Sequence, residues 1–232
     1  MEKIIYKLKI FADKNLYEWQ IPHGCPIDIP DSLQTEFDKN VYLKENFYKL
    51  PKDEQEKHFY WIIQEWGGIK SFKRSEKNDE RIKKFLNELN KLKVGGDSFS
   101  CISSLSKIAS FTAPQNYAIY DSRVIYSLNW LLFNYTDEYE LFPQPNGRNV
   151  ELSKYNLDTI FRLTKRNFSY INNSQAYIKY CNLLKELTPK IYGENGEIYM
   201  LEMLLFTIAD SAIVKELEKS VSMNIDTNVL LA

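Results

Sequence analysis

Apolar residues recur along most of the chain at the spacing that is typical of amphipathic helices. Between residues 79 and 93 they fall at Ile82, Phe85, Leu86 and Leu89, and two glycines then end the helix. The same spacing predicts helices over 33–50, 52–66, 98–112, 121–133, 152–163, 174–187 and 197–220. The pattern therefore indicates a mainly α, multi-helix fold with about seven or eight helices.

A short β arm at the N-terminus is the one exception to this pattern. From Lys3 to Phe11, polar residues alternate loosely with β-favouring ones, and prolines follow at positions 22, 26 and 30. We therefore expect a strand or an extended segment before the first helix.

The composition is that of a globular protein. Of the 232 residues 44% are hydrophobic, which suffices for a substantial core, and only eight glycines and eight prolines occur, which argues against a turn-rich β-sandwich. We expect a single mainly helical domain over residues 1–232. The alternative is two lobes divided near 142–149, where two prolines and Gly147 make the best candidate boundary.

Charge is unevenly distributed along the chain, although the formal net charge is only −1. Nine basic and four acidic residues lie between Lys70 and Lys93, whereas seven acids and two lysines lie from Glu194 to the end. Such asymmetry could present one positive face to the phosphates of DNA. The alternative is an ordinary solvated helix surface, which charge runs of this kind form more often.

Several kinds of functional site have no signature in the sequence. The three cysteines are far apart and there are only two histidines, so we expect no disulfide framework, no metal site and no Ser-His-Asp triad. Glycine-rich nucleotide-binding motifs are also missing, and we expect no cofactor. The first ten residues are too charged for a signal peptide, and the most apolar stretch, 199–214, contains two acids. These features predict a cytoplasmic protein without a membrane partner.

The most informative stretch is SCISSLSKIASFTAPQNYAIYDSRVIYSLNWLL, residues 100–132. In its first helix the apolar residues share one face, whereas Lys107 lies on another face with Ser103, Ser106 and Ser110. This serine stripe has two interpretations. It is either a close helix contact from which Lys107 extends to solvent, or the floor of a pocket into which a single amine projects. A lone lysine is more often an ordinary surface residue.

Asp121 begins the second helix of this stretch. Aspartate is a favoured N-cap, because its carboxylate accepts hydrogen bonds from the free N–H groups of the first turn. Capping alone explains Asp121 about as well as a chemical role does. Arg123 follows within the first turn, where a cation is unfavourable to the helix dipole, so we expect it to contact a phosphate or an acidic side chain.

Taken together, these residues resemble the active site of the helix-hairpin-helix DNA glycosylases, in the 8-oxoguanine DNA glycosylase branch. Ser106-Lys107-Ile108-Ala109 is similar to the Lys-aliphatic-Ala step that follows the hairpin in that family. Residues 118–124, AIYDSRV, are similar to the stretch around its active-site aspartate. Ser104 and Ser106 stand where the family has the hairpin glycines whose N–H groups contact a DNA phosphate.

The resemblance implies a DNA N-glycosylase that could also have β-lyase activity, acting on double-stranded DNA in repair or phage defence. The target nucleotide would be flipped out of the duplex. Lys107 would attack its sugar at C1′ and form a Schiff base, while Asp121 would steer the proton and stabilise positive charge on the sugar. The base pocket would include Trp66, Tyr117 and Tyr120, and the DNA contacts would come from Ser104, Ser106, Arg123, Lys70, Lys73 and Arg74.

The alternative is a non-catalytic helical module that binds nucleic acid or a protein partner. In that interpretation Lys107 is a surface lysine, Asp121 is a helix cap, and the aromatic residues are core packing. The sequence specifies neither the target base nor the oligomeric state.

Overall fold

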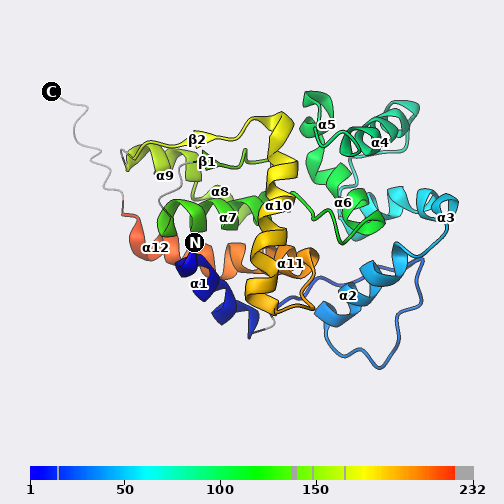
Figure 1. Cartoon of the computed structure of the whole chain (residues 1–232), viewed down its shortest axis with the longest axis horizontal. Coiled ribbons are helices and arrows are strands. Elements are labelled where there is room, and N and C mark those ends of the chain that lie inside the picture. The colour runs from blue at the N-terminus through cyan, green and yellow to red at the C-terminus, as the bar shows by residue number, and fades with distance from the viewer. Residues whose placement is uncertain (15, 137–139, 148, 165, 223–232) are drawn as a thin grey trace.

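The computed structural model describes residues 1–14, 16–136, 140–147, 149–164 and 166–222, and it is mainly helical over these residues (Figure 1). The helices are α1 (Glu2–Ala12), α2 (Glu36–Phe47), α3 (Lys52–Lys57), α4 (Glu76–Leu89), α5 (Gly96–Ser100), α6 (Ile102–Thr112), α7 (Ser122–Tyr135), α8 (Val150–Ser153), α9 (Leu157–Leu163), α10 (Asn173–Tyr192), α11 (Ile198–Ile208) and α12 (Val214–Ser220). The other elements are two π-helical turns, Trp61–Trp66 and Ala209–Ile213, and two short parallel strands, β1 (Glu140–Leu141) and β2 (Ser169–Tyr170). The predicted mainly α, multi-helix fold is confirmed.

The first segment of the chain is the helix α1, so the predicted β arm over Lys3–Phe11 is wrong. Ile4 and Leu8 lie one helical turn apart, and neither has any exposed surface. Through this face α1 packs against α7, α10 and α11. The loose alternation indicated a strand, but burial of a single stripe selects the helix, because tertiary packing outweighs a weak local preference.

Most of the predicted helices are present, but several are broken into shorter segments. The helix predicted over 52–66 becomes α3 and a π-helical turn, and the one over 98–112 becomes α5 and α6 with Cys101 between them. The helix predicted over 197–220 becomes α11, the second π-helical turn and α12. The spacing of apolar residues does not reveal such breaks, because an interrupted helix continues to bury the same face.

One main hydrophobic cluster contains buried residues from nearly all of these helices. The helices α7 and α11 pack side by side within it, and α10 packs against α11 (Figure 1). On the right of Figure 1, α6 packs against α2 and the first π-helical turn. Buried residues on both sides of 142–149 belong to the cluster, and the two-lobe alternative stays a prediction.

The segment that follows β1 is held against α7 by the side chain of Asn129, which is 2% exposed. Its Nδ2 donates to the carbonyl oxygen of Phe142 (2.8 Å), and its Oδ1 accepts from the N–H of the same residue (2.9 Å). The hydroxyl of Tyr120 adds a hydrogen bond to the carbonyl oxygen of Pro143 (2.8 Å). Because one buried side chain satisfies both polar groups of the Phe142 backbone, the position of this segment depends on α7.

We expect Asn129→Leu to lower the free energy of unfolding by about 2–4 kcal/mol, because the N–H and C=O of Phe142 would both lose their buried partner. Urea unfolding followed by circular dichroism measures this loss. Asn134→Ala is the matched control on α7, since Asn134 is exposed and its Nδ2 donates to the carbonyl oxygen of Trp130 within the same helix. The control should change stability by no more than about 0.5 kcal/mol. Equal losses in the two variants would contradict the anchoring role of Asn129.

Candidate active site

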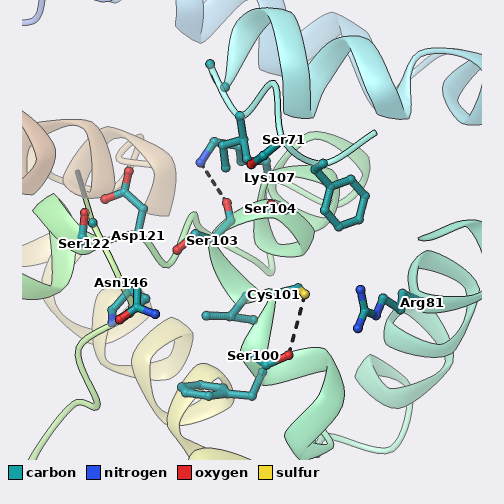
Figure 2. A pocket seen from close by; sticks show the side chains of 18 of the residues that line it. Ser71, Arg81, Ser100, Cys101, Ser103, Ser104, Lys107, Asp121, Ser122 and Asn146 are labelled. Carbon is teal, nitrogen blue, oxygen red and sulfur yellow. Dashed lines mark hydrogen bonds between the residues drawn. The ribbon is translucent and has the colours of Figure 1, made fainter. Parts of the chain in front are cut away.

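A cavity of about 700 Å³ opens between α4, α5, α6, the start of α7 and the segments 67–72 and 144–147 (Figure 2). Its volume lies within the range of small-molecule sites, roughly 300–1,000 Å³. About half of its wall is polar, and the lining residues are Gly67, Gly68, Ile69, Ser71, Phe72, Asn78, Arg81, Phe99, Ser100, Cys101, Ile102, Ser103, Ser104, Lys107, Asp121, Ser122, Gln144, Pro145, Asn146 and Gly147. The structure therefore brings the candidate pair, Lys107 and Asp121, to one cavity.

Lys107 is buried on α6 although it carries an ionisable amine. Its exposed fraction is 5%, and its Nζ donates to the carbonyl oxygen of Ser103, one turn earlier (2.8 Å). Burial lowers the pKa of Lys107, because a desolvated ammonium is costly, and the nearby Asp121 and Glu202 carboxylates only partly oppose this shift. A lysine with a lowered pKa carries more of its neutral, nucleophilic form near neutral pH. The amine thus lines the cavity and does not extend into open solvent.

Gly67 allows the first π-helical turn to approach Lys107 closely. A Cβ atom at this glycine would lie 2.5 Å from both Cδ and Cε of Lys107 and 2.8 Å from the carbonyl oxygen of Ile63. Any larger residue at position 67 must therefore displace the lysine or the turn. The turn itself, Trp61–Trp66, ends immediately before the glycine, and π-helical turns often occur at functional sites.

Asp121 is the N-cap of α7 and faces the same cavity. Its carboxylate accepts the N–H of Val124 (3.0 Å), and its backbone is extended before the helix begins. Figure 2 shows the Asp121 carboxylate and the Lys107 amine turned toward the same hollow. In this structure the amine donates to the carbonyl oxygen of Ser103 and the carboxylate accepts from the N–H of Val124, so each group has a partner other than the other member of the pair. Even so, the charge of Asp121 acts on the pKa of Lys107 more than any other charge does.

A second, much smaller cavity of about 30 Å³ shares Gly67, Lys107 and Asp121 with the first. The rest of its wall consists of Tyr17, Trp19, Trp66, Ile119, Glu202 and Phe206. Trp66, which the sequence analysis assigns to the base pocket, therefore lies beside the candidate pair, on the wall of this inner cavity.

Lys44 and Glu202 form a buried ion pair next to the inner cavity, which was not predicted from the sequence. The Nζ of Lys44 lies 3.0 Å from Oε2 of Glu202 and also donates to Oγ of Ser110 (2.8 Å). Burial lowers the pKa of Lys44 and raises that of Glu202, and each charge opposes the shift of the other. An acid within the apolar stretch 199–214 is a signal for such a pair, because acids are seldom buried alone. Nothing in the sequence marks Lys44 as its partner.

The resemblance implies that Ser104 and Ser106 lie at a hairpin. In the structure both are instead buried inside α6. The N–H of Ser104 donates to the carbonyl oxygen of Cys101 (2.9 Å), and the turn between α5 and α6 is at Cys101 itself. The hydroxyl of Ser106 accepts the backbone N–H of Tyr120 (3.0 Å). Ser104 still lines the larger cavity, whereas Ser106 holds the connection that leads to Asp121.

The two tyrosines that the sequence analysis assigns to the base pocket are packed elsewhere. Tyr120 is fully buried, with its hydroxyl on the carbonyl oxygen of Pro143. Tyr117 is half-buried and stacks on Tyr177 of α10, with the ring centroids 6.0 Å apart. Neither residue lines the two cavities that contain Lys107. Their contacts instead join α10 to the connection between α6 and α7.

Arg123 pairs with an acid, which is one of the two contacts expected for a cation in the first turn of α7. Its guanidinium lies 3.4 Å from Oδ2 of Asp210 and sits over the ring of Phe206, with its central carbon 4.7 Å from the ring centroid. The acidic partner offsets the unfavourable position of this cation at the start of a helix.

Lys70, Lys73 and Arg74 are exposed. Lys70 and Lys73 are next in sequence to Ile69, Ser71 and Phe72, which line the larger cavity, whereas Arg74 is two positions from Phe72 and lies over the ring of Tyr60. Lys70 is paired with Glu65. These three cations are therefore close in sequence to the cavity-lining segment 69–72, and they are exposed to solvent.

Comparison with known proteins found no match for this chain among protein-family models, curated proteins or solved structures. The resemblance to the glycosylases therefore depends on residues 100–132 alone. Within the described ranges, no cluster of three or more His, Cys, Asp or Glu side chains could hold a metal ion, and no helix has the length and apolar character needed to cross a membrane.

We expect Gly67→Ala to lower the free energy of unfolding by about 1–3 kcal/mol, because the added methyl group would overlap the side chain of Lys107. Urea unfolding measures the change. Gly96→Ala is the matched control, since a Cβ at Gly96 would meet nothing within 4 Å. If Gly67→Ala were as stable as Gly96→Ala, the close approach of the turn to Lys107 would not be a constraint on the fold.

Proposed function

We propose that the chain is a DNA N-glycosylase that removes a damaged or modified base through Lys107. It also has β-lyase activity if the Schiff base intermediate then undergoes β-elimination. The observation that carries this proposal is that a buried amine and a carboxylate, from consecutive long helices, line one cavity of about 700 Å³. A base inside a duplex is inaccessible, so the nucleotide must first leave the stack and enter this cavity.

Lys107 is the nucleophile in the proposed reaction. Its neutral amine attacks C1′ of the flipped nucleotide, the bond between C1′ and the base nitrogen breaks, and the bonding electrons leave with the base. The attacking nitrogen gives up a proton, which the departing base takes. The bond between C1′ and the ring oxygen then breaks, the oxygen takes the remaining proton of the nitrogen, and a C=N double bond forms, which yields the Schiff base between Lys107 and C1′. The lowered pKa of the buried amine favours the first step, since only the neutral form attacks.

Asp121 stabilises the positive charge that develops on the sugar and carries the proton from the amine to the base. Its hydrogen bond from the N–H of Val124 fixes the carboxylate at the start of α7. Capping and catalysis are compatible, because both use the negatively charged carboxylate and leave one of its oxygens able to face the cavity.

The exposed cations Lys70, Lys73 and Arg74 support double-stranded DNA as the partner. A duplex that covers the mouth of the cavity would bring its phosphates within reach of these side chains, and phosphate contacts supply most of the sequence-independent affinity for DNA. Lys70 would then exchange its present partner, Glu65, for a phosphate.

One observation favours the alternative, a non-catalytic helical module that binds nucleic acid or a protein. Ser104 and Ser106 are buried within α6, so their N–H groups do not present the phosphate contact that the resemblance implies. A covalent trapping experiment separates the two proposals.

We expect borohydride, which reduces a Schiff base to a stable amine, to trap the wild-type protein on at least one duplex from a panel of damaged or modified bases. Lys107→Ala should lose the adduct. Asp121→Asn should keep the helix cap, since asparagine caps as well as aspartate does, and should slow adduct formation by about 100-fold or more. Gel electrophoresis of the denatured adduct measures both effects.

Lys83→Ala is the control for this experiment, because Lys83 is an exposed lysine on α4, and this variant should be trapped like the wild type. An adduct that persists in Lys107→Ala would contradict the assignment of the nucleophile. The absence of both adduct and base release on every duplex would favour the non-catalytic module.

Replacing Lys70, Lys73 and Arg74 together by alanine should weaken DNA binding equally for all sequences. The slope of log affinity against log salt should decrease by about 0.9 for each phosphate contact that is lost. Fluorescence anisotropy of a labelled duplex at several salt concentrations measures this slope. The matched control replaces three exposed cations of α10, Lys179, Lys185 and Lys190. An equal change of slope in both variants would place the duplex away from the cavity mouth.

A further inference from the structure

Four ionisable side chains meet behind the larger cavity, and they come from four helices. Lys107 of α6, Asp121 at the start of α7 and Glu202 of α11 share the wall of the inner cavity. Lys44 of α2 is entirely buried beside Glu202. The reaction proposed above uses Lys107 and Asp121 and gives no role to the other two.

Glu202 is the carboxylate that could compete for the amine of Lys107. Asp121 already accepts a backbone N–H in its helix cap. Glu202 is bonded through Oε2 to Lys44 and lines the inner cavity together with Lys107. Without Lys44, a buried Glu202 beside a desolvated amine would favour the charged ammonium of Lys107, and an ammonium does not attack C1′.

Lys44 is held in place by contacts that tie it to the helix carrying the candidate nucleophile. Its Nζ donates to Oγ of Ser110 on α6 (2.8 Å) and to Oε2 of Glu202 (3.0 Å). The same nitrogen lies 5.7 Å from the ring centroid of Trp66, within the range of a cation–π interaction. The ion pair is therefore fixed both to α6 and to the first π-helical turn.

We propose that Lys44 is a positioning residue for Lys107, because it holds Glu202 in a buried ion pair and so keeps that carboxylate from pairing with the Lys107 amine. This inference rests on the proposed function, since the state of the amine matters when Lys107 is a nucleophile. Its electrostatic consequence can nevertheless be measured without DNA.

The charges around Lys107 agree with this role. Burial lowers the pKa of Lys107, the carboxylates of Asp121 and Glu202 raise it, and the ammonium of Lys44 lowers it again. Lys44 therefore acts twice, through its own charge and through its pairing with Glu202. The other ionisable side chains of the two cavity walls are Tyr17, Arg81 and Cys101.

The test is competitive labelling of the full-length chain with trace acetic anhydride, with the modification of Lys107 followed by peptide mass spectrometry across a pH series. Only neutral amines react, so the labelling rate at a fixed pH reports the neutral fraction of Lys107. In Lys44→Met we expect this rate near pH 8 to fall by about threefold or more, because the unpaired Glu202 would favour the ammonium. In Glu202→Gln we expect it to rise.

The double variant Lys44→Met/Glu202→Leu is the matched control, because replacing both partners of a buried ion pair with apolar residues often leaves a protein folded. Its Lys107 should be labelled within about twofold of the wild type, since the pair as a whole has no net charge. The exposed Lys83 should be labelled equally in all variants. If circular dichroism shows that Lys44→Met does not fold, the labelling rates of Glu202→Gln and the double variant test the proposal instead.

Labelling of Lys107 that is unchanged in both single variants, or lowered equally in Lys44→Met and the double variant, would overturn the role of Lys44. Failure of the proposed function has a different signature. In that case the wild type gives no DNA adduct, while the order of labelling rates stays Glu202→Gln, wild type, Lys44→Met.

Discussion

The candidate site depends on the burial of a single amine. Lys107 is enclosed between α6 and the first π-helical turn, and Gly67 supplies the space for its side chain. An ammonium in such a place has lost most of its hydration, which lowers its pKa and makes nearby charges effective over longer distances than at a surface. The other charged groups of the interior are arranged around this residue.

The position of Asp121 relative to this amine is set by hydrogen bonds from two neighbouring helices. Ser106 of α6 accepts the N–H of Tyr120, immediately before the aspartate. Tyr177 and Tyr180 of α10 donate to the carbonyl oxygens of residues 118 and 119 (3.0 and 2.7 Å). Ser106, which the resemblance assigns to a DNA contact, and two buried tyrosines of α10 thus hold the backbone that carries the Asp121 carboxylate. The cap of α7 then orients its side chain.

The charges of the molecule fall into two groups, one on the surface and one in the interior. Cations on the surface, such as Lys70 and Lys73, remain hydrated, are accessible to phosphates and are screened by salt. The interior pair of Lys44 and Glu202 is buried and so is little screened by dissolved salt. Its charges act on Lys107 through an interior of low dielectric constant. The proposed binding of a polyanion and the proposed tuning of Lys107 therefore involve two separate groups of charges.

The pairing of Lys107 with Asp121 as a candidate site came from the resemblance to the glycosylases, whereas the sequence alone predicted the helical class, the approximate extent of most helices and a helix cap at Asp121. These features follow from local rules, since periodic apolar residues define a buried face and an aspartate before such a face caps a helix. Only the tertiary structure decided that α1 is a helix, that Tyr120 is core packing, and that Lys44 meets Glu202 across 158 positions of sequence. The physical reason is that local spacing specifies which face of a segment is buried, whereas the partner it is buried against depends on how all the segments pack at once.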